Sequence, residues 1–196
     1  MDRPAGRPAR ADAQRNRERL LEVAAEVVAE QGTQASLRDV ARRAGVGLGT
    51  LYRHFPNRDA LLEALLHRRF EQLAERADAL AATEPSGRAL GTWLHEFTLG
   101  AGAYHGLSGA LLATLNEPGS SLHAACLVNR QACGRLLAAA QRDGLVRADV
   151  DAVDLFALAN GLAWIADQAP SLADRRDRLF GLVLDGLAPR SSGESP

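Results

Sequence analysis

The sequence predicts an all-α protein with a three-helix head at the N-terminus and a larger helical body. Apolar residues recur three and four positions apart along most of the chain, as they do on the buried face of a helix. No segment alternates apolar and polar residues in the way of a half-buried strand. With 196 residues, the chain is long enough for a small domain and a larger one.

The chain begins with a basic arm, residues 1–11, in which proline, glycine and arginine occur without apolar periodicity. We expect this arm to be flexible. A first helix is predicted from about Asp12 to Gln31, and Gly32 lies at the usual position of a helix-ending glycine.

Two short helices are expected next. Ser36 opens the second helix, and Asp39 lies three positions later, which resembles a capping box. Gly45 allows the chain to reverse. A third helix is predicted from Leu48 to His54, and Asn57 is expected to cap the helix that follows.

The remaining chain is expected to form the body. Its predicted helices cover residues 58–82, 88–104, 107–115, 120–142, 151–168 and 172–187. A polar tail, residues 189–196, is expected to be disordered. The predicted domains are therefore a head over residues 12–57 and a body over residues 58–188.

Charge is distributed unevenly along the chain. Residues 1–58 contain 11 arginines against 7 acidic residues, a net charge of +4. Residues 59–196 contain 12 arginines against 17 acidic residues, a net charge of −5. A basic end on an acidic protein favours contact with a phosphate backbone at that end alone.

Residues 36–55 are typical of a helix-turn-helix that places its second helix in the major groove of DNA. Hydroxyl groups on that helix can bond phosphate oxygens, and arginine suits the edge of guanine. We therefore expect double-stranded DNA as a partner, with contacts from Arg38, Gly49, Thr50, Tyr52, Arg53, His54 and Arg58.

The segment ARRAGVGLGTLYRHFPNRDALLEALL, within residues 14–62, resembles the N-terminal domain of the tetracycline-repressor (TetR) family of regulators. The resemblance covers about a quarter of the chain. It is carried by the spacing of Leu37, Gly45, Leu51, Tyr52 and Phe55 and by an N-x-x-A-L-L helix start.

The resemblance implies a transcriptional regulator, most often a repressor, whose helical body dimerises and binds a small molecule. It also implies that Arg58 lies where family members carry a basic phosphate contact. Gly47 and Leu48 depart from the family pattern, which often has Ser or Thr at the first position and a polar residue at the second. We therefore expect fewer base contacts from this helix.

The predicted body contains apolar helices with isolated polar residues, which is typical of a ligand cavity. We expect a small apolar inducer to be bound by Trp93, Phe97, Tyr104, Asn129, Asn160 and Trp164. The asparagines would orient the inducer by hydrogen bonds. The alternative is that these aromatic residues form ordinary core and that backbone groups satisfy the amides.

A second apolar stripe on the last two predicted helices favours a homodimer. Two helices from each subunit would form a four-helix interface with two-fold symmetry. The expected interface residues are Leu155, Leu158, Leu162, Leu179, Leu182 and Val183. Such a dimer could present two recognition helices about 34–36 Å apart, as a palindromic operator requires.

Two further functions remain possible on the sequence. Cys126 and Cys133, with His123 nearby, could make a thiol- or metal-responsive regulator. However, residues seven positions apart lie about 10 Å apart along a helix, so no metal site and no cofactor are expected. The other possibility is a small-molecule-binding protein that has lost DNA binding. A helical adaptor is a weaker option.

The sequence excludes the common enzyme motifs. It has no Ser-His-Asp order, no glycine-rich phosphate loop and no H-E-x-x-H motif, so we do not expect an enzyme. No apolar run reaches the roughly 18 residues that a membrane span needs, and the N-terminus has no apolar leader segment. A cytoplasmic protein with no membrane partner is therefore expected.

Overall fold

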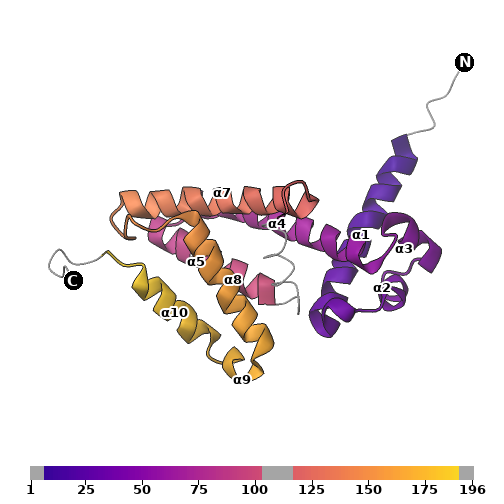
Figure 1. Cartoon of the computed structure of the whole chain (residues 1–196). Helices are drawn as coiled ribbons and strands as arrows, with labels where there is room; N and C mark the ends of the chain where they lie inside the picture. Colours follow the sequence, from indigo (N-terminus) through magenta and orange to yellow (C-terminus); the bar gives the residue numbers. More distant parts are fainter. Residues whose placement is uncertain (1–6, 103–116, 190–196) are drawn as a thin grey trace, which may run out of the picture. The chain divides into compact units, whose positions relative to one another are not determined.

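The computed structural model describes residues 7–102 and 117–189, and every regular element within them is a helix (Figure 1). The all-α prediction is thus confirmed. In chain order the elements are α1 (Arg7–Gln31), η1 (Gly32–Gln34), α2 (Leu37–Arg43), α3 (Leu48–His54), α4 (Arg58–Thr83), α5 (Ser86–Gly102), α7 (Ser121–Arg142), α8 (Ala152–Gln168), α9 (Pro170–Ala173) and α10 (Arg176–Gly186).

The chain divides into two compact units, residues 1–66 and residues 67–196, which we call the head and the body. The division falls inside α4. Leu61, Leu65 and Leu66 from the first turns of α4 are buried, yet they are not part of the body's core. These leucines explain why the head extends beyond the predicted boundary at residue 57.

Helix α1 starts at Arg7, earlier than the predicted start at Asp12. Part of the expected flexible arm is therefore helical. The predicted start is too late because a proline usually breaks a helix, whereas Pro8 lies in the first turn of α1. Proline is tolerated in the first turn of a helix, where its missing N–H would have no intrahelical partner. Residues 1–6 lie outside the described residues.

The head is built around one small apolar core in which α2 packs against α1 and α3 packs against α2. Its fully buried side chains come from all three helices and include Leu20, Val27, Val40, Leu51 and Phe55. The guanidinium of Arg17 lies 5.6 Å from the centre of the Phe55 ring, where its charge is attracted by the ring face. Burial of this core fixes the face that α3 presents to solvent.

Gly45 makes the turn between α2 and α3. Its φ angle is +67°, in the left-handed region that side chains with a Cβ rarely adopt. The amide of Val46 donates to the carbonyl of Ala41 at 3.0 Å, which closes the end of α2. The predicted bounds of the third helix, Leu48 to His54, agree with α3.

The two predicted caps differ in outcome. The side chain of Asn57 accepts a hydrogen bond from the amide of Ala60 at 2.8 Å, so the predicted cap of α4 is confirmed. The side chain of Ser36 makes no capping bond at the start of α2, so the predicted capping box is wrong. The carboxylate of Asp39 is instead occupied by side chains of α1 and α2, as described below.

The body is a helical bundle in which α5 packs against α7 and α8, and α8 also contacts α7 and α10 (Figure 1). Its core is continuous across α4, α5, α7, α8 and α10 and centres on Trp93, which is fully buried. Helix α8 begins with a full capping box between Asp151 and Asp154. This cap stabilises the start of the helix.

The last predicted helix, residues 172–187, is divided in the structure. Pro170 starts the short helix α9, which ends at Ala173, and α10 begins at Arg176. Proline suits the first helical position, so it restarts the chain before the predicted helix begins. The predicted helix at residues 107–115 and nearly all of the polar tail lie outside the described residues.

We predict opposite effects of alanine at two glycines of the head. Gly45→Ala should lower the free energy of unfolding by about 1–2 kcal/mol, because alanine is strained at positive φ. Gly49→Ala should raise it by about 0.5 kcal/mol, since Gly49 is helical and the methyl group of alanine would have no atom within 4 Å. Urea unfolding followed by circular dichroism measures both. Equal midpoints for the two variants would contradict the assigned role of the turn.

Candidate nucleic-acid interface and ligand cleft

Helix α3 has one buried side and one exposed side. Leu51 is fully buried and Phe55, just after the helix, is 2% exposed. On the other side Tyr52 is 46% exposed and Arg53 is also exposed. The helix thus directs a phenol and a guanidinium to solvent within two adjacent positions, which is the chemistry that bonds phosphates and base edges.

The other predicted DNA-contacting residues are exposed or half-buried in the head. Thr50 and His54 are half-buried on α3, while Arg38 on α2 and Arg58 at the start of α4 are exposed. Arg53 folds back along its own helix and donates to the carbonyl of Gly49 at 3.3 Å and to the hydroxyl of Thr50 at 3.4 Å. These weak contacts allow the arginine to move toward a ligand.

A cluster of four charged residues and one amide joins α1 to α2. Asp39 accepts hydrogen bonds from Gln31 at 3.0 Å, from Arg43 at 3.1 Å, and from Arg42. Arg43 also makes a bidentate contact with Glu30 at 2.9 and 2.7 Å. The donors of Arg42 lower the pKa of the Asp39 carboxyl, and Arg43 likewise lowers the pKa of Glu30, so both acids stay ionised at neutral pH.

Two of the aromatic residues predicted to line a pocket, Trp93 and Phe97, lie instead in the core of the body. Trp93 stacks on Phe97 with ring centres 5.6 Å apart, and Phe97 meets Phe156 at 4.8 Å. The indole N–H of Trp93 donates to the carbonyl of Leu73 at 2.7 Å. Large rings that meet each other and the backbone in this way leave no room for a ligand between them.

The asparagines predicted as ligand-orienting groups are bonded to backbone. Asn129 donates to the carbonyl of Phe70 at 3.0 Å, and Asn160 donates to that of Phe156 at 2.8 Å. Trp164, expected in the pocket, is 49% exposed on α8. Tyr104 lies outside the described residues. The alternative weighed from the sequence, in which backbone groups satisfy the amides, holds for the N–H groups of the two asparagines, while the amide oxygens of both are buried without a hydrogen-bond partner among the described residues.

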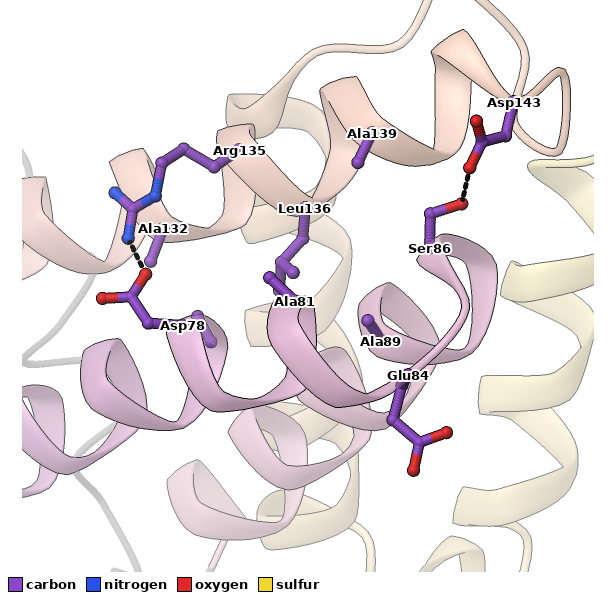
Figure 2. A pocket seen from close by; sticks show the side chains of 11 residues that line it. Asp78, Ala81, Glu84, Ser86, Ala89, Ala132, Arg135, Leu136, Ala139 and Asp143 are labelled. Carbon is purple, nitrogen blue, oxygen red and sulfur yellow. Dashed lines mark hydrogen bonds and ion pairs between the residues drawn. The ribbon is translucent and has the colours of Figure 1, made fainter.

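A different hollow exists between α4, α5 and α7, which we call the alanine cleft (Figure 2). Its volume is about 370 Å³. The methyl groups of five alanines line its walls together with Leu136, and the lining residues are Ala77, Asp78, Ala81, Glu84, Ser86, Ala89, Ala132, Arg135, Leu136, Ala139 and Asp143. None of the residues predicted to bind an inducer is among them.

The polar groups around the alanine cleft are paired with one another. Arg135 donates to Asp78 at 2.7 Å at one end, and the hydroxyl of Ser86 donates to Asp143 at 2.5 Å at the other (Figure 2). Glu84 pairs with Arg88 at 3.0 Å. The rim therefore carries one carboxylate more than it has arginines, since the partner of Asp143 is a neutral hydroxyl, and the walls between these groups are apolar. No sequence pattern pointed to this site, because single alanines carry no signal of a cavity.

The two cysteines are buried and unbonded in α7. Burial raises the pKa of Cys126 to about 11 and that of Cys133 to about 12, so both thiols are protonated at neutral pH. In residues 7–102 and 117–189, no three His, Cys, Asp or Glu side chains gather closely enough to hold a metal ion.

The residues predicted to form a dimer interface divide into two groups. Leu158 and Leu182 are 45% and 58% exposed, and Leu162, Leu179 and Val183 are half-buried. Leu155, by contrast, is 1% exposed inside the body's core. It differs from expectation because α8 has its core-facing side at this position. Val153 and Trp164 are exposed apolar residues of α8 that the predicted interface does not include.

Along the described part of the chain, each helix is too short or too polar to cross a lipid bilayer.

Two family models match the chain. The model for bacterial regulatory proteins of the tetR family matches residues 20–65, which include the helix-turn-helix. The model for the C-terminal domain of SbtR-like transcriptional regulators matches residues 85–189. Together they cover most of the head and most of the body.

Several relatives and solved structures are similar to the chain. The TetR transcriptional regulator SCO0520 from Streptomyces coelicolor is 36% identical, with a TM-score of 0.71 over 89% of this chain and 99% of that one. A TetR transcription regulatory protein from Mycobacterium vanbaalenii is 38% identical, with a TM-score of 0.66 over 92% and 99%. FadR from Bacillus subtilis, solved in complex with stearoyl-CoA, shares the fold at 21% identity, with a TM-score of 0.56 over 86% and 98%.

The transcriptional repressor KstR of Mycolicibacterium smegmatis is 41% identical over 81 residues, which are 39% of this chain. The chain spans about 40% of the length of that curated relative. These matches are to transcriptional regulators and not to enzymes.

We predict that both thiols react slowly in the folded protein. At pH 8 a thiol with a pKa of about 11 is ionised in about one molecule in a thousand. Alkylation by iodoacetamide, followed by mass spectrometry, should be at least about 100-fold slower in the native protein than in guanidinium, and faster as the pH rises. Rapid native labelling would contradict this prediction and favour the thiol-responsive alternative.

Proposed function

Because the chain belongs to the TetR family of bacterial transcriptional regulators, we propose that it is a homodimeric repressor released from a palindromic operator by a small apolar ligand. The observation that carries this proposal is the two-sided character of α3. The same seven-residue helix buries Leu51 in the head and exposes Tyr52 and Arg53. A helix fixed in this way offers a rigid polar face to a groove.

In the proposed complex α3 enters the major groove. Thr50 and Tyr52 bond phosphate oxygens and set the register, while Arg53 and His54 reach base edges or further phosphates. Gly49 has open space where other residues carry a β-carbon, which lets a phosphate approach the backbone. Arg38 and Arg58 add phosphate contacts from the two flanking helices.

The proposed dimer interface is the apolar face of α8 and α10. Four exposed or half-buried residues of the predicted interface lie there, namely Leu158, Leu162, Leu179 and Leu182, and Val183 is half-buried on α10. Apolar side chains as exposed as Leu182 lose contact with water when a second copy covers them. Leu155 is not part of this proposed interface, since the body's own core already covers it.

The proposed ligand site is the alanine cleft. Its methyl-lined walls favour an apolar molecule, and its volume of about 370 Å³ suits a small one. Helix α4 supplies Ala77, Asp78 and Ala81 to the cleft and begins at Arg58, one of the proposed DNA contacts. A ligand that binds better to one arrangement of α4 would shift the population of DNA-binding protein. FadR, with its stearoyl-CoA, is an example of this fold binding a ligand.

The proposal is tested by selecting duplexes from a random library with the purified protein. We expect enrichment of a two-fold palindrome with half-sites about one helical turn apart, bound at least about 1,000-fold more tightly than unrelated duplex. Fluorescence anisotropy measures both affinities. Equal, weak and salt-sensitive binding to every duplex would overturn the proposal and favour a ligand-binding protein that has lost its operator.

A monomeric variant tests whether the preference for a palindrome depends on the dimer. Leu182→Asp should dissociate the dimer, as seen by sedimentation, and should abolish the preference for the palindrome. Val128→Asp is the matched control, because Val128 is 49% exposed on α7, a helix that supplies no residue to the proposed interface. It should remain dimeric and keep the preference.

We predict that an apolar dye occupies the alanine cleft. Nile red should bind the protein with saturable fluorescence, and Ala139→Phe should weaken that binding by about tenfold or more, since the ring fills the cleft. Ala138→Phe is the matched control, because Ala138 is exposed on the same helix and does not line the cleft. Equal dye binding by both variants would exclude the cleft as the dye's site.

A further inference from the structure

Two neighbouring arginines of α2 are held in different ways. Arg43 is 31% exposed and contacts the carboxylates of both Glu30 and Asp39. Arg42 is 73% exposed and, among the described residues, pairs with Asp39 alone. Arg43 therefore connects α2 to α1, while Arg42 lies on the surface with a single partner that it can exchange.

Arg42 also lies four residues after Arg38, so the two side chains share one face of α2. Arg38 is exposed and is one of the proposed DNA contacts. A phosphate that reaches Arg38 on this face comes within range of a long, exposed arginine one turn later. Arg42 is thus a cation placed for DNA but occupied by Asp39.

Asp39 is the centre of this arrangement and is itself only 18% exposed. One of its oxygens accepts from Gln31 and Arg43, and the other accepts from Arg42. The oxygen Oδ2 of Asp39 thus accepts two hydrogen bonds from within the head, while, within the described part of the chain, Oδ1 accepts only the bond from Arg42. The two acids and two arginines of the cluster sum to zero charge, so this part of the basic head offers no free positive charge to a passing polyanion.

We propose that Asp39 sets the specificity of DNA binding by holding Arg42 away from the phosphates of unrelated duplex and releasing it only when α3 is seated in its operator. This inference rests on the proposed function of the head. On unrelated DNA the phosphates lie at variable distances from α2, so Arg42 remains paired with the carboxylate of Asp39, one turn away on the same helix. In the seated complex one phosphate is held beside α2, and Arg42 exchanges the carboxylate for it.

The exchange is energetically feasible because an ion pair whose guanidinium is largely exposed to water is weak. A phosphate contact, by contrast, releases a condensed counterion, which favours binding and makes it depend on salt. Each phosphate neutralised adds about 0.9 to the slope of log K against log salt. The number of arginines that engage can therefore be counted for each kind of DNA.

The experiment measures this slope by anisotropy on the selected operator and on an unrelated duplex of equal length. Arg42→Gln should leave the slope on unrelated duplex unchanged and should reduce that on the operator by about 1 to 2 for a dimer with two heads. Because Arg42 is so exposed, this variant is expected to fold. An equal reduction on both duplexes would overturn the inference.

Asp39→Asn supplies the opposite arm. It should steepen the slope on unrelated duplex by about 1 to 2 and bring its affinity closer to that for the operator. Asp39→Asn combined with Arg42→Gln should restore the wild-type slope on unrelated duplex, which a purely structural role of Asp39 would not do. Glu30→Gln is the control, since it loosens Arg43 and leaves the Arg42 pair in place.

The outcomes separate the two proposals. If the wild-type protein selects no sequence, the proposed repressor function fails, whatever Asp39 does. If it selects an operator but Asp39→Asn leaves the slope on unrelated duplex unchanged, the repressor function stands and the role of Asp39 is overturned.

Discussion

Two helices of seven residues cannot be stable by themselves, and the head depends on this constraint. Isolated helices shorter than about 12–15 residues are marginal in water, so α2 and α3 exist because α2 is buried against α1 and α3 against α2. Leu51 and Val40, both fully buried, connect them to the same small core. The consequence is functional. The burial of Leu51 determines which face of α3 is exposed to solvent, and it thereby fixes the orientation of the polar residues on that face.

The head could be predicted in detail because its signals are local. The bounds of α3, the turn at Gly45 and the cap by Asn57 each follow from a few adjacent residues, and each agrees with the structure. The site residues on α3 followed from the same segment. The role of Asp39 could not be predicted in this way. The spacing of Asp39 from Ser36 indicated a capping box. Gln31, which lies on α1, donates to Asp39 only once α1 and α2 have packed together, and Arg43 then also contacts Glu30 of α1.

The body shows the opposite relation between sequence and site. Aromatic residues attract attention in a sequence, yet Trp93 and Phe97 are large enough to fill the space that they share with Phe156. A cavity forms where side chains are too short to meet, and in this protein alanines on three helices leave the cleft. Alanine favours helix and says nothing of its neighbours on other helices. The cleft is therefore a property of packing, which periodicity along one helix does not reveal.

The small size of α3 gives a reason for the exposed apolar residues of α8 and α10, because a short recognition helix needs a second copy of the chain. One short helix makes few base contacts, so a single head gains little discrimination between sequences. Two linked heads bind with the second contact made effectively intramolecular, which multiplies the preference for a site with matching symmetry. Leu182 is exposed to water in a single chain, and in the proposed dimer a second copy covers it. The proposed dimer is thus the condition under which a helix of seven residues suffices to read DNA.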